Sequence, residues 1–232
     1  MKKLTKRLKV TGTLSDKSKA YSLKDAIAIL KKAPKLKFDE TVEVSAKLTV
    51  DPKQSQSASI RGTVALPHGT GKKVIVAVFC KGEEEKRAKE AGADFVGADD
   101  MIVRVQGGWV GFDVAIATPE MMRDMAKLGK VLGPRGLMPN PKSGTVTMDT
   151  AKTVKEVKAG KIEFKMDKQA GIHAPLGKIS FTEDALHANA TALIDAIMSS
   201  HSGGIRGQHI KNIYISTTMG PGIKLDLAEF RK

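Results

Sequence analysis

Two predominantly apolar runs in the middle of the chain restrict its fold more than any other sequence feature. Residues 74–79 read VIVAVF and residues 112–117 read FDVAIA. Short continuous runs of this kind are typical of parallel strands that are covered on both faces. Helical patterns at residues 83–91 and 119–128 alternate with them. Because strands that alternate with helices form parallel sheets, we expect residues 68–159 to form a Rossmann-like α/β domain.

The segments on either side have a different pattern. Over residues 41–50 (TVEVSAKLTV), apolar and polar side chains alternate, which predicts a strand with one buried and one exposed face. Ser22 is a suitable N-cap for a helix that ends before Pro34. The same reasoning predicts strands at 60–66, 161–165 and 212–217 and a helix at 183–198.

Half-exposed strands at both chain ends, around a buried α/β pattern, indicate an inserted domain. One domain would consist of residues 1–67 and 160–232, and residues 68–159 would form the other. The two chain crossings, at residues 67–68 and 159–160, are natural hinges. The predicted fold class is therefore α/β with two domains: a discontinuous α/β domain from both chain ends and an inserted Rossmann-like α/β domain.

The positive charge of the chain is concentrated at its start. The sequence has 39 Lys and Arg residues against 25 Asp and Glu residues, a formal charge of +14. Residues 1–37 hold 12 basic and two acidic residues, a net charge of +10. A basic segment favours a polyanionic partner, because neutralising phosphates releases condensed counterions. For residues 1–19 two interpretations stay open: a solvated tail, or an arm that lies on a phosphate backbone.

Composition excludes several classes of protein. No apolar stretch approaches the 18 residues of a membrane span, and the basic start of the chain lacks the apolar region of a secretory signal. The single cysteine, Cys80, cannot form an intramolecular disulfide, which fits a reducing cytoplasm. One Trp, two Tyr and seven Phe are too few for a surface built mainly on stacking.

The sequence has an enzyme-like fold pattern without an enzyme's motifs. The five histidines show no zinc-binding spacing, and neither a dinucleotide fingerprint nor a nucleophile elbow is present. HGTGKK at residues 68–73 lacks the first glycine of a phosphate loop, which would stand at Leu66, and Lys73 replaces the required Ser or Thr. We expect no metal, cofactor or catalytic residue. The alternative is a nucleotide-dependent α/β enzyme.

The loop at residues 128–144, LGKVLGPRGLMPNPKSG, is unusually rich in glycine and proline. Its glycines permit uncommon backbone angles and its prolines restrict them, which predicts an ordered, non-repetitive loop. Basic side chains occur along it, namely Lys127, Lys130, Arg135 and Lys142. The loop is either a rigid structural connection with solvated charges or a surface that presents cations and backbone amides to RNA.

This loop closely resembles the signature of the large-subunit ribosomal proteins of the mobile side stalk, the L-one ribosomal protein family, in its bacterial form. The resemblance extends across nearly the whole chain. It includes KFDETVEVSAKLTVDP at 37–52, RGTVALPHGTGK at 61–72, AGADFVGADD at 91–100, KAGKIEF at 158–164, GIHAPLGK at 171–178 and TTMGPGIKLD at 217–226. Residues 1–19 match none of the family's motifs.

The resemblance implies a function. Members of this family are not enzymes, and they have the two-domain arrangement described above. They bind a folded region of large-subunit rRNA, chiefly through the discontinuous domain, and form the mobile stalk beside the exit-site tRNA. Bacterial members also repress translation by binding the mRNA of their own operon. The resemblance implies a cytoplasmic protein that is a monomer when free of the ribosome. A purely regulatory mRNA-binding protein outside the ribosome is the remaining alternative.

The resemblance also implies which residues contact RNA. They fall into a group that precedes or opens the alternating strand, a group that follows the last strand, and a loop expected to face both. The residues are Lys37, Phe38 and Thr41; Thr218, Met219 and Gly220; and Asp167, Lys168 and His173. Hydroxyls can bond to 2′-hydroxyls or phosphates, lysines neutralise phosphates, and Gly220 allows close backbone approach.

Overall fold

The computed structural model describes residues 6–16, 19–49, 60–200 and 210–230. Within them the chain forms both helices and strands in mixed order, so the predicted α/β class is confirmed. None of the described helices has the length and apolar character needed to span a membrane.

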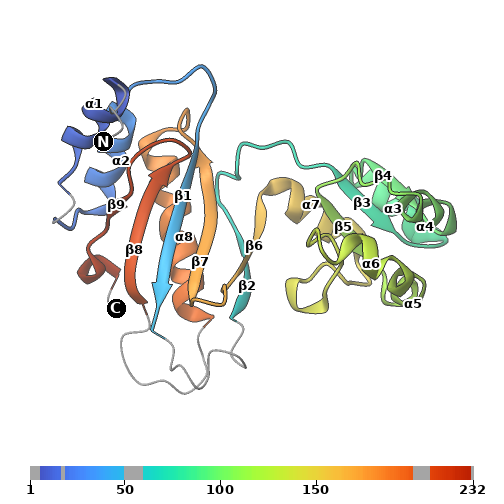
Figure 1. Cartoon of the computed structure of the whole chain (residues 1–232). Helices are drawn as coiled ribbons and strands as arrows, with labels where there is room; N and C mark the ends of the chain where they lie inside the picture. Colours follow the sequence, from blue (N-terminus) through green and yellow to red (C-terminus); the bar gives the residue numbers. More distant parts are fainter. Residues whose placement is uncertain (1–5, 17–18, 50–59, 201–209, 231–232) are drawn as a thin grey trace. The chain divides into compact units, whose positions relative to one another are not determined.

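The chain divides into two compact units (Figure 1). Unit 1 consists of residues 1–71 and 162–232, and unit 2 of residues 72–161. The chain passes from one unit to the other four residues after the first expected boundary and two residues after the second. Each unit has a hydrophobic core of its own.

Unit 1 is built around a four-stranded antiparallel sheet in the order β7-β1-β8-β9. Its strands are β1 (Thr41–Leu48), β7 (Gly171–Lys178), β8 (Ile210–Thr217) and β9 (Ile223–Lys224). β1 has the predicted alternation, since its even-numbered residues are buried. The last predicted strand residue, Val50, lies outside the described residues. The sequence reasoning missed β7, in which Gly171, Pro175 and Gly177 weaken the local strand signal.

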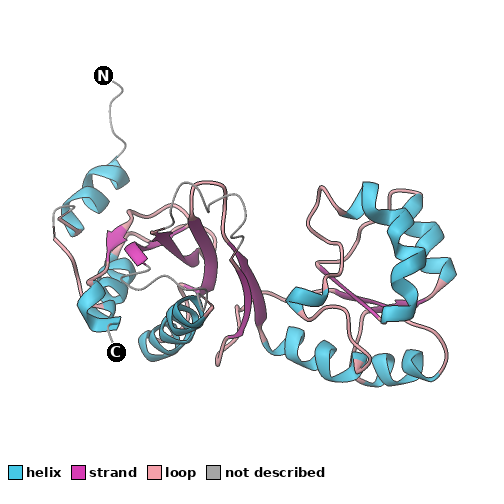
Figure 2. Ribbon diagram, turned by 90° about the horizontal axis from the view of Figure 1, so that it is seen from below, coloured by secondary structure: helices cyan, strands magenta, loops and turns pink. Residues whose placement is uncertain are grey.

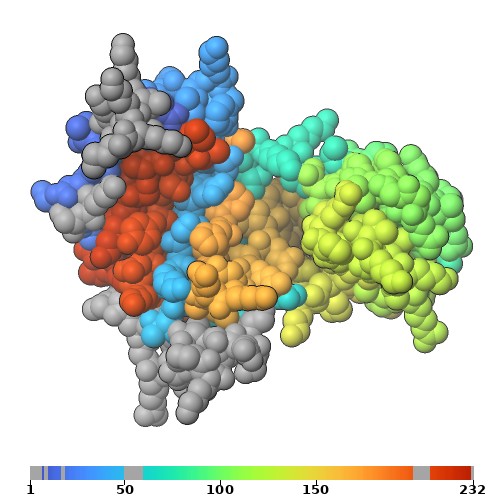
Figure 3. Space-filling model, viewed as in Figure 1, coloured from blue at the N-terminus to red at the C-terminus, as the bar shows by residue number. Residues whose placement is uncertain are grey.

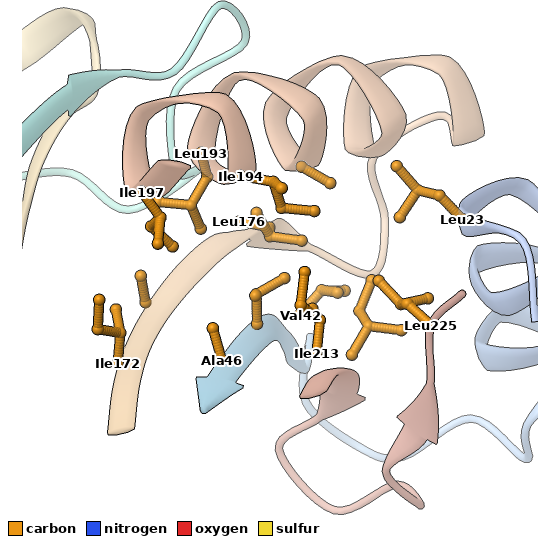
Figure 4. Packing of buried hydrophobic residues seen from close by; sticks show 14 of the residues in the cluster. Leu23, Val42, Ala46, Ile172, Leu176, Leu193, Ile194, Ile197, Ile213 and Leu225 are labelled. Atoms are coloured by element: carbon orange, nitrogen blue, oxygen red, sulfur yellow. The ribbon is translucent and has the colours of Figure 1, made fainter. Parts of the chain in front are cut away.

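Two helices, α2 (Leu23–Lys32) and α8 (Glu183–Ser199), pack on one face of this sheet. Ser22 caps α2 as predicted, because its hydroxyl accepts a hydrogen bond from the backbone N–H of Asp25 at 3.2 Å. Figure 4 shows apolar side chains of α8 lying against those of β7, β1 and β8. Over the opposite face of these strands, no helix lies among the described residues (Figure 2).

The N-terminal segment forms a helix, α1 (Lys6–Leu14). Thr11 is buried and the guanidinium of Arg7 donates to the carbonyl of Met219, so α1 contacts the rest of unit 1 although its other described side chains are largely exposed. The rest of the arm, residues 1–5 and 17–18, lies outside the described part of the chain.

Unit 2 contains a parallel sheet in the order β4-β3-β5, formed by Phe95–Gly97, Val76–Phe79 and Val114–Ala117. Every residue of β3 is buried, as its apolar run predicts. The helices α3 (Glu83–Glu90) and α7 (Thr150–Ala159) share one core with this sheet. The sequence reasoning missed β4 and the helix α4 (Asp99–Gln106), which belongs to a second core.

The predicted helix at residues 119–128 is a series of short helical turns that ends later, at Leu132. The turns are η1 (Pro119–Met121), α5 (Met122–Met125), η2 (Ala126–Leu128) and α6 (Gly129–Leu132). The buried side chains of Met121, Met125, Leu128 and Leu132 retain the helical spacing. The alternation between three- and four-residue hydrogen bonding divides what the pattern predicts as one helix.

The remaining elements are short. β2 (Arg61–Ala65) pairs with β6 (Lys161–Lys165) in a two-stranded sheet. Single 3₁₀ turns occur at η3 (Pro141–Ser143) and η4 (Leu227–Phe230).

Candidate nucleic-acid interface

The start of β1 and the turn after β8 form one hydrogen-bonded structure. The backbone N–H of Thr41 donates to the hydroxyl of Thr218 at 3.0 Å, and the backbone N–H of Thr218 donates to the carbonyl of Thr41 at 3.0 Å. Lys178 completes the group, because its ammonium donates to the hydroxyl of Thr41 at 2.9 Å. The structure therefore brings together Thr41 and Thr218, two of the residues that the sequence assigns to RNA binding.

Two side chains that the sequence reasoning did not select hold the backbone of Met219. The carboxylate of Glu40 accepts hydrogen bonds from the N–H of Met219 at 2.9 Å and from the hydroxyl of Thr217 at 3.2 Å. On the other side, the guanidinium of Arg7 in α1 donates to the carbonyl of Met219. Nothing in the local sequence distinguishes the buried Glu40 from its exposed neighbour Asp39.

Gly220 is required by the turn itself. A Cβ atom added there would lie 2.3 Å from the hydroxyl oxygen of Thr217, far inside van der Waals contact. Gly220 therefore lies close to Thr217 in the same turn. That Gly220 also lets RNA approach the backbone stays a prediction.

Large apolar side chains are exposed at this end of the sheet. Phe38 is 53% exposed and Met219 is 56% exposed. Lys37, next to Phe38, is exposed and forms no ion pair among the described residues. An exposed aromatic ring, a flexible thioether and a free cation are groups that can contact bases and phosphates.

Asp167 orders a turn between β6 and β7. Its carboxylate oxygen accepts hydrogen bonds from the N–H of Gly171 at 2.6 Å and from that of Gln169 at 2.8 Å. These bonds, first that of Gly171, hold the pKa of Asp167 below its ordinary value. The turn also contains Ala170 at a φ of 61°, in the left-handed region. Lys168 is exposed on this turn.

The expectation that this turn faces the other two groups is wrong. In the antiparallel register, Lys178 pairs with Thr41 at one end of β1, whereas Gly171 pairs with Lys47 at the other end. Because β7 runs antiparallel to β1, the Asp167 turn lies a whole strand length away from Thr218. The sequence motifs do not indicate which residues of β1 and β7 pair with one another.

The open face of the sheet joins the two ends. We use this name for the outward-facing side chains of β1, β7 and β8, which lie side by side at the surface in Figure 3. His173, which was expected on the same loop as Asp167, instead lies within β7 opposite Ser45 and belongs to the open face. Its Nδ1 is 3.0 Å from the hydroxyl of Ser45 and its Nε2 is 3.8 Å from the Asp167 carboxylate. The open face includes Glu43, Ser45, Lys47, His173, Pro175, Asn212, Tyr214 and Ser216.

The HGTGKK segment has a structural role in unit 1. Buried Asn189 of α8 accepts a hydrogen bond from the N–H of His68 at 3.0 Å. The same side chain donates to the carbonyls of Gly69 at 2.9 Å and Leu176 at 2.7 Å. The backbone of this loop is therefore fixed to α8 and β7.

The glycine- and proline-rich loop of unit 2 is ordered by its own polar groups. Asn140 caps the turn η3 by accepting from the N–H of Lys142 at 2.9 Å, and its N–H donates to the hydroxyl of Thr145 at 2.8 Å. Lys130, Arg135 and Lys142 are exposed and form no ion pair among the described residues. The loop is thus ordered, and these three side chains are available to an anion, whereas the ammonium of Lys127 lies 3.5 Å from the carboxylate of Asp124.

The described residues show no site for metal or thiol chemistry. Across residues 6–16, 19–49, 60–200 and 210–230, no three His, Cys, Asp or Glu side chains gather as metal ligands would. Cys80, directly after β3, is buried. Burial raises the pKa of its thiol to about 11, which keeps the sulfur protonated and unreactive.

Known proteins with similar sequences are components of the large ribosomal subunit. "Large ribosomal subunit protein uL1" of Protochlamydia amoebophila (strain UWE25) is 52% identical over 97% of this chain and 95% of its own length. The protein of the same name from Lactobacillus acidophilus is 53% identical over 91% of each chain.

The model of the ribosomal protein L1p/L10e family matches residues 30–221. The chain belongs to this family, so the resemblance inferred from its motifs is confirmed. Membership also confirms a structural, non-enzymatic ribosomal protein in the cytoplasm, and the alternative of a nucleotide-dependent enzyme is wrong.

Proposed function

We propose that the protein binds a folded region of large-subunit rRNA through unit 1, and that the open face and the Thr218–Gly220 turn carry the contact. In this proposal Lys37, Phe38, Thr41 and the turn hold one part of the RNA. Asp167, Lys168 and His173 meet another part at the far end of the face. The RNA would lie along β1 rather than enter a cleft between the groups.

The observation that carries this proposal is the open face itself. An antiparallel sheet commonly leaves one face to solvent, but this face ends in two ordered turns and carries hydroxyl, imidazole and phenol groups. Such groups recognise the 2′-hydroxyls and the shape of folded RNA rather than charge alone. Exposed Phe38 and Met219 at one end provide the apolar contacts.

Local preorganisation supports the same assignment. Thr218 already bonds to Thr41, and Met219 is held by Glu40 and Arg7, so the turn has its shape before any RNA arrives. A preformed surface loses little conformational entropy on binding. Recognition by shape therefore needs no folding of the protein around the RNA.

Binding measurements with the stalk rRNA fragment test this proposal. At fixed salt, the affinity for that fragment should exceed the affinity for an unrelated structured RNA of equal length by about 10³-fold or more, the usual scale of specific over non-specific binding. Equal affinities would show attraction by charge alone and would contradict the proposal.

We further propose the roles that the family resemblance implies beyond rRNA binding. The protein forms the mobile stalk that takes part in the release of exit-site tRNA. It also represses translation of its own operon by binding the mRNA at the surface that binds rRNA, and it is a monomer when free. Because both RNAs would use one surface, the rRNA fragment should displace the mRNA leader in a competition experiment. Simultaneous binding of both RNAs would contradict a shared site.

Co-sedimentation separates the ribosomal role from a purely regulatory one. A protein of the stalk should sediment with large subunits at ionic strengths that remove non-specifically bound proteins. A regulator that acts only on mRNA would stay in the supernatant. For tRNA, the basic loop of unit 2 supports a contact, since Lys130, Arg135 and Lys142 form no ion pair within the described part of the chain.

A further inference from the structure

A hollow of about 560 Å³ lies between the end of α2 and the segment that leads into β1. Its apolar walls come from Leu30, Leu36 and Ile179, and Phe38 stands beside them with its ring more than half exposed. The volume is in the range of sites that hold small organic ligands.

Charge and apolar surface are combined in this hollow. Three lysines line it, Lys31, Lys35 and Lys37, and none forms an ion pair among the described residues. The two carboxylates nearby are occupied. Asp39 accepts hydrogen bonds from the N–H and the hydroxyl of Ser180, and Glu40 accepts them from the turn after β8. Neither carboxylate forms an ion pair with these lysines among the described residues, so the lysine ammonium groups are available to an anion.

An apolar slot with an exposed aromatic ring and unpaired cations matches the chemistry of one nucleotide. A base can stack on the ring of Phe38 and contact the aliphatic walls, while the lysines bind its flanking phosphates. A purely apolar ligand would leave the lysine charges unused, and a bare anion would leave the walls wet. Both properties together select a base that carries phosphate.

The hollow is continuous with the proposed RNA surface. Glu40 lines it and also holds the N–H of Met219, so the hollow and the turn share a residue. An RNA bound at the turn therefore has its backbone close to the mouth of the hollow. We propose that the hollow receives an unpaired nucleotide of the bound RNA, which stacks on Phe38 and pairs its phosphates with Lys31 and Lys35. This inference rests on the proposed function.

Fluorine NMR tests the hollow directly. The full chain is labelled with 4-fluorophenylalanine, and the Phe38 resonance is assigned by its loss in Phe38→Leu. A mixed-sequence single-stranded hexanucleotide RNA should shift this resonance saturably, whereas inorganic polyphosphate should not. Lys35→Ala should lower the affinity for the hexanucleotide by up to about tenfold. Lys155 is an exposed lysine of α7, and Lys155→Ala should leave this affinity unchanged.

Three results would overturn the inference: no shift of Phe38, the same shift with polyphosphate, or a nucleoside monophosphate that binds as tightly as the hexanucleotide. The last result would assign the hollow to a free nucleotide.

Binding of the stalk rRNA fragment is measured with the same sample. Selective binding of that fragment without a Phe38 shift would contradict the hollow alone. A Phe38 shift with the hexanucleotide, but without selectivity for the fragment, would contradict the proposed function alone.

Discussion

The carboxylate of Glu40 accepts a hydrogen bond from the backbone N–H of Met219 at 2.9 Å, and Glu40 is only 6% exposed. A buried charge of this kind is stable only when its acceptor sites are used, and here Thr217 supplies the second donor. The residue before β1 thus fixes the shape of a turn that lies 179 positions later in the sequence.

Replacing Glu40 should therefore destabilise the turn and weaken RNA binding together. In Glu40→Ala, the N–H of Met219 and the hydroxyl of Thr217 lose their acceptor, which should lower the free energy of unfolding by about 1–3 kcal/mol. Glu40→Gln keeps one acceptor oxygen and should lose less. Urea unfolding and rRNA titration measure the two effects. The control is Glu163→Ala, an exposed carboxylate of β6. A Glu40→Ala protein as stable as this control would refute the role.

Met219→Ala tests contact with RNA without disturbing the fold. The side chain is 56% exposed, so its removal should leave the free energy of unfolding unchanged. Affinity for the stalk rRNA should fall by roughly 1–3 kcal/mol if the thioether packs against RNA. Met148→Ala, at a 68% exposed methionine of unit 2, is the matched control and should change neither quantity. An rRNA affinity equal to that of the control would exclude Met219 from the interface.

Thr218→Ala should behave differently from Met219→Ala. The hydroxyl of Thr218 accepts from the N–H of Thr41, so its loss should lower stability as well as rRNA affinity. The affinity loss should again be about 1–3 kcal/mol. Thr218→Ser keeps the hydroxyl and should restore most of both. If Thr218→Ala lost affinity but kept its full stability, the bond to Thr41 would be unimportant in solution.

Asp167 should make stability depend on pH in the acid range. Hydrogen bonds from the backbone N–H groups of Gly171 and Gln169 lower the pKa of Asp167 from its ordinary value of 3.8. Its ionised carboxylate therefore stabilises the fold above pH 4. This contribution is lost as pH falls through the lowered pKa. Asp167→Asn should therefore be less stable than the wild-type chain at pH 7, and the difference should shrink toward pH 3. Glu90→Gln serves as the exposed control. A difference that stayed constant from pH 7 to pH 3 would contradict this assignment.

Periodicity predicted the elements whose burial is simple. β1 alternates, β3 is buried on both faces, and Ser22 caps α2, so each appears where the sequence places it. β7 was missed because two glycines and a proline interrupt its pattern, and β4 was missed because it is only three residues long. These strands are defined by their partners, a tertiary property that local sequence does not contain.

For the candidate site, the sequence motifs supplied residues but not their arrangement, and the RNA contacts of these residues stay a prediction. The motifs contained Thr41 and Thr218, which do meet. They did not contain the antiparallel register that moves Asp167 to the far end of β1. Glu40 was missed for the same reason, since its only distinguishing feature is a bond to a turn far away in sequence.

The basic arm should contribute charge rather than selectivity. Deleting residues 1–19 removes much of the charge of the segment that holds a net +10, so the slope of log affinity against log salt should become flatter. Preference for the stalk rRNA over unrelated RNA should persist. Because Arg7 also binds the carbonyl of Met219, Arg7→Ala alone is a necessary second variant. Loss of selectivity in Arg7→Ala would show that α1 acts by holding the turn.

Unit 1 should bind the stalk rRNA without unit 2. Its core is formed entirely by residues before 72 and after 161, so a chain in which a Gly-Ser linker replaces residues 72–161 retains every buried contact of that core. The rRNA affinity of this shortened chain should stay within about tenfold of that of the full chain, because the open face and both turns remain. Unfolding measurements establish first that the shortened chain is folded. A folded unit 1 that bound the stalk rRNA no better than unrelated RNA would show that recognition requires unit 2. The exposed cations of unit 2, Lys130, Arg135 and Lys142, would then be the first residues to substitute.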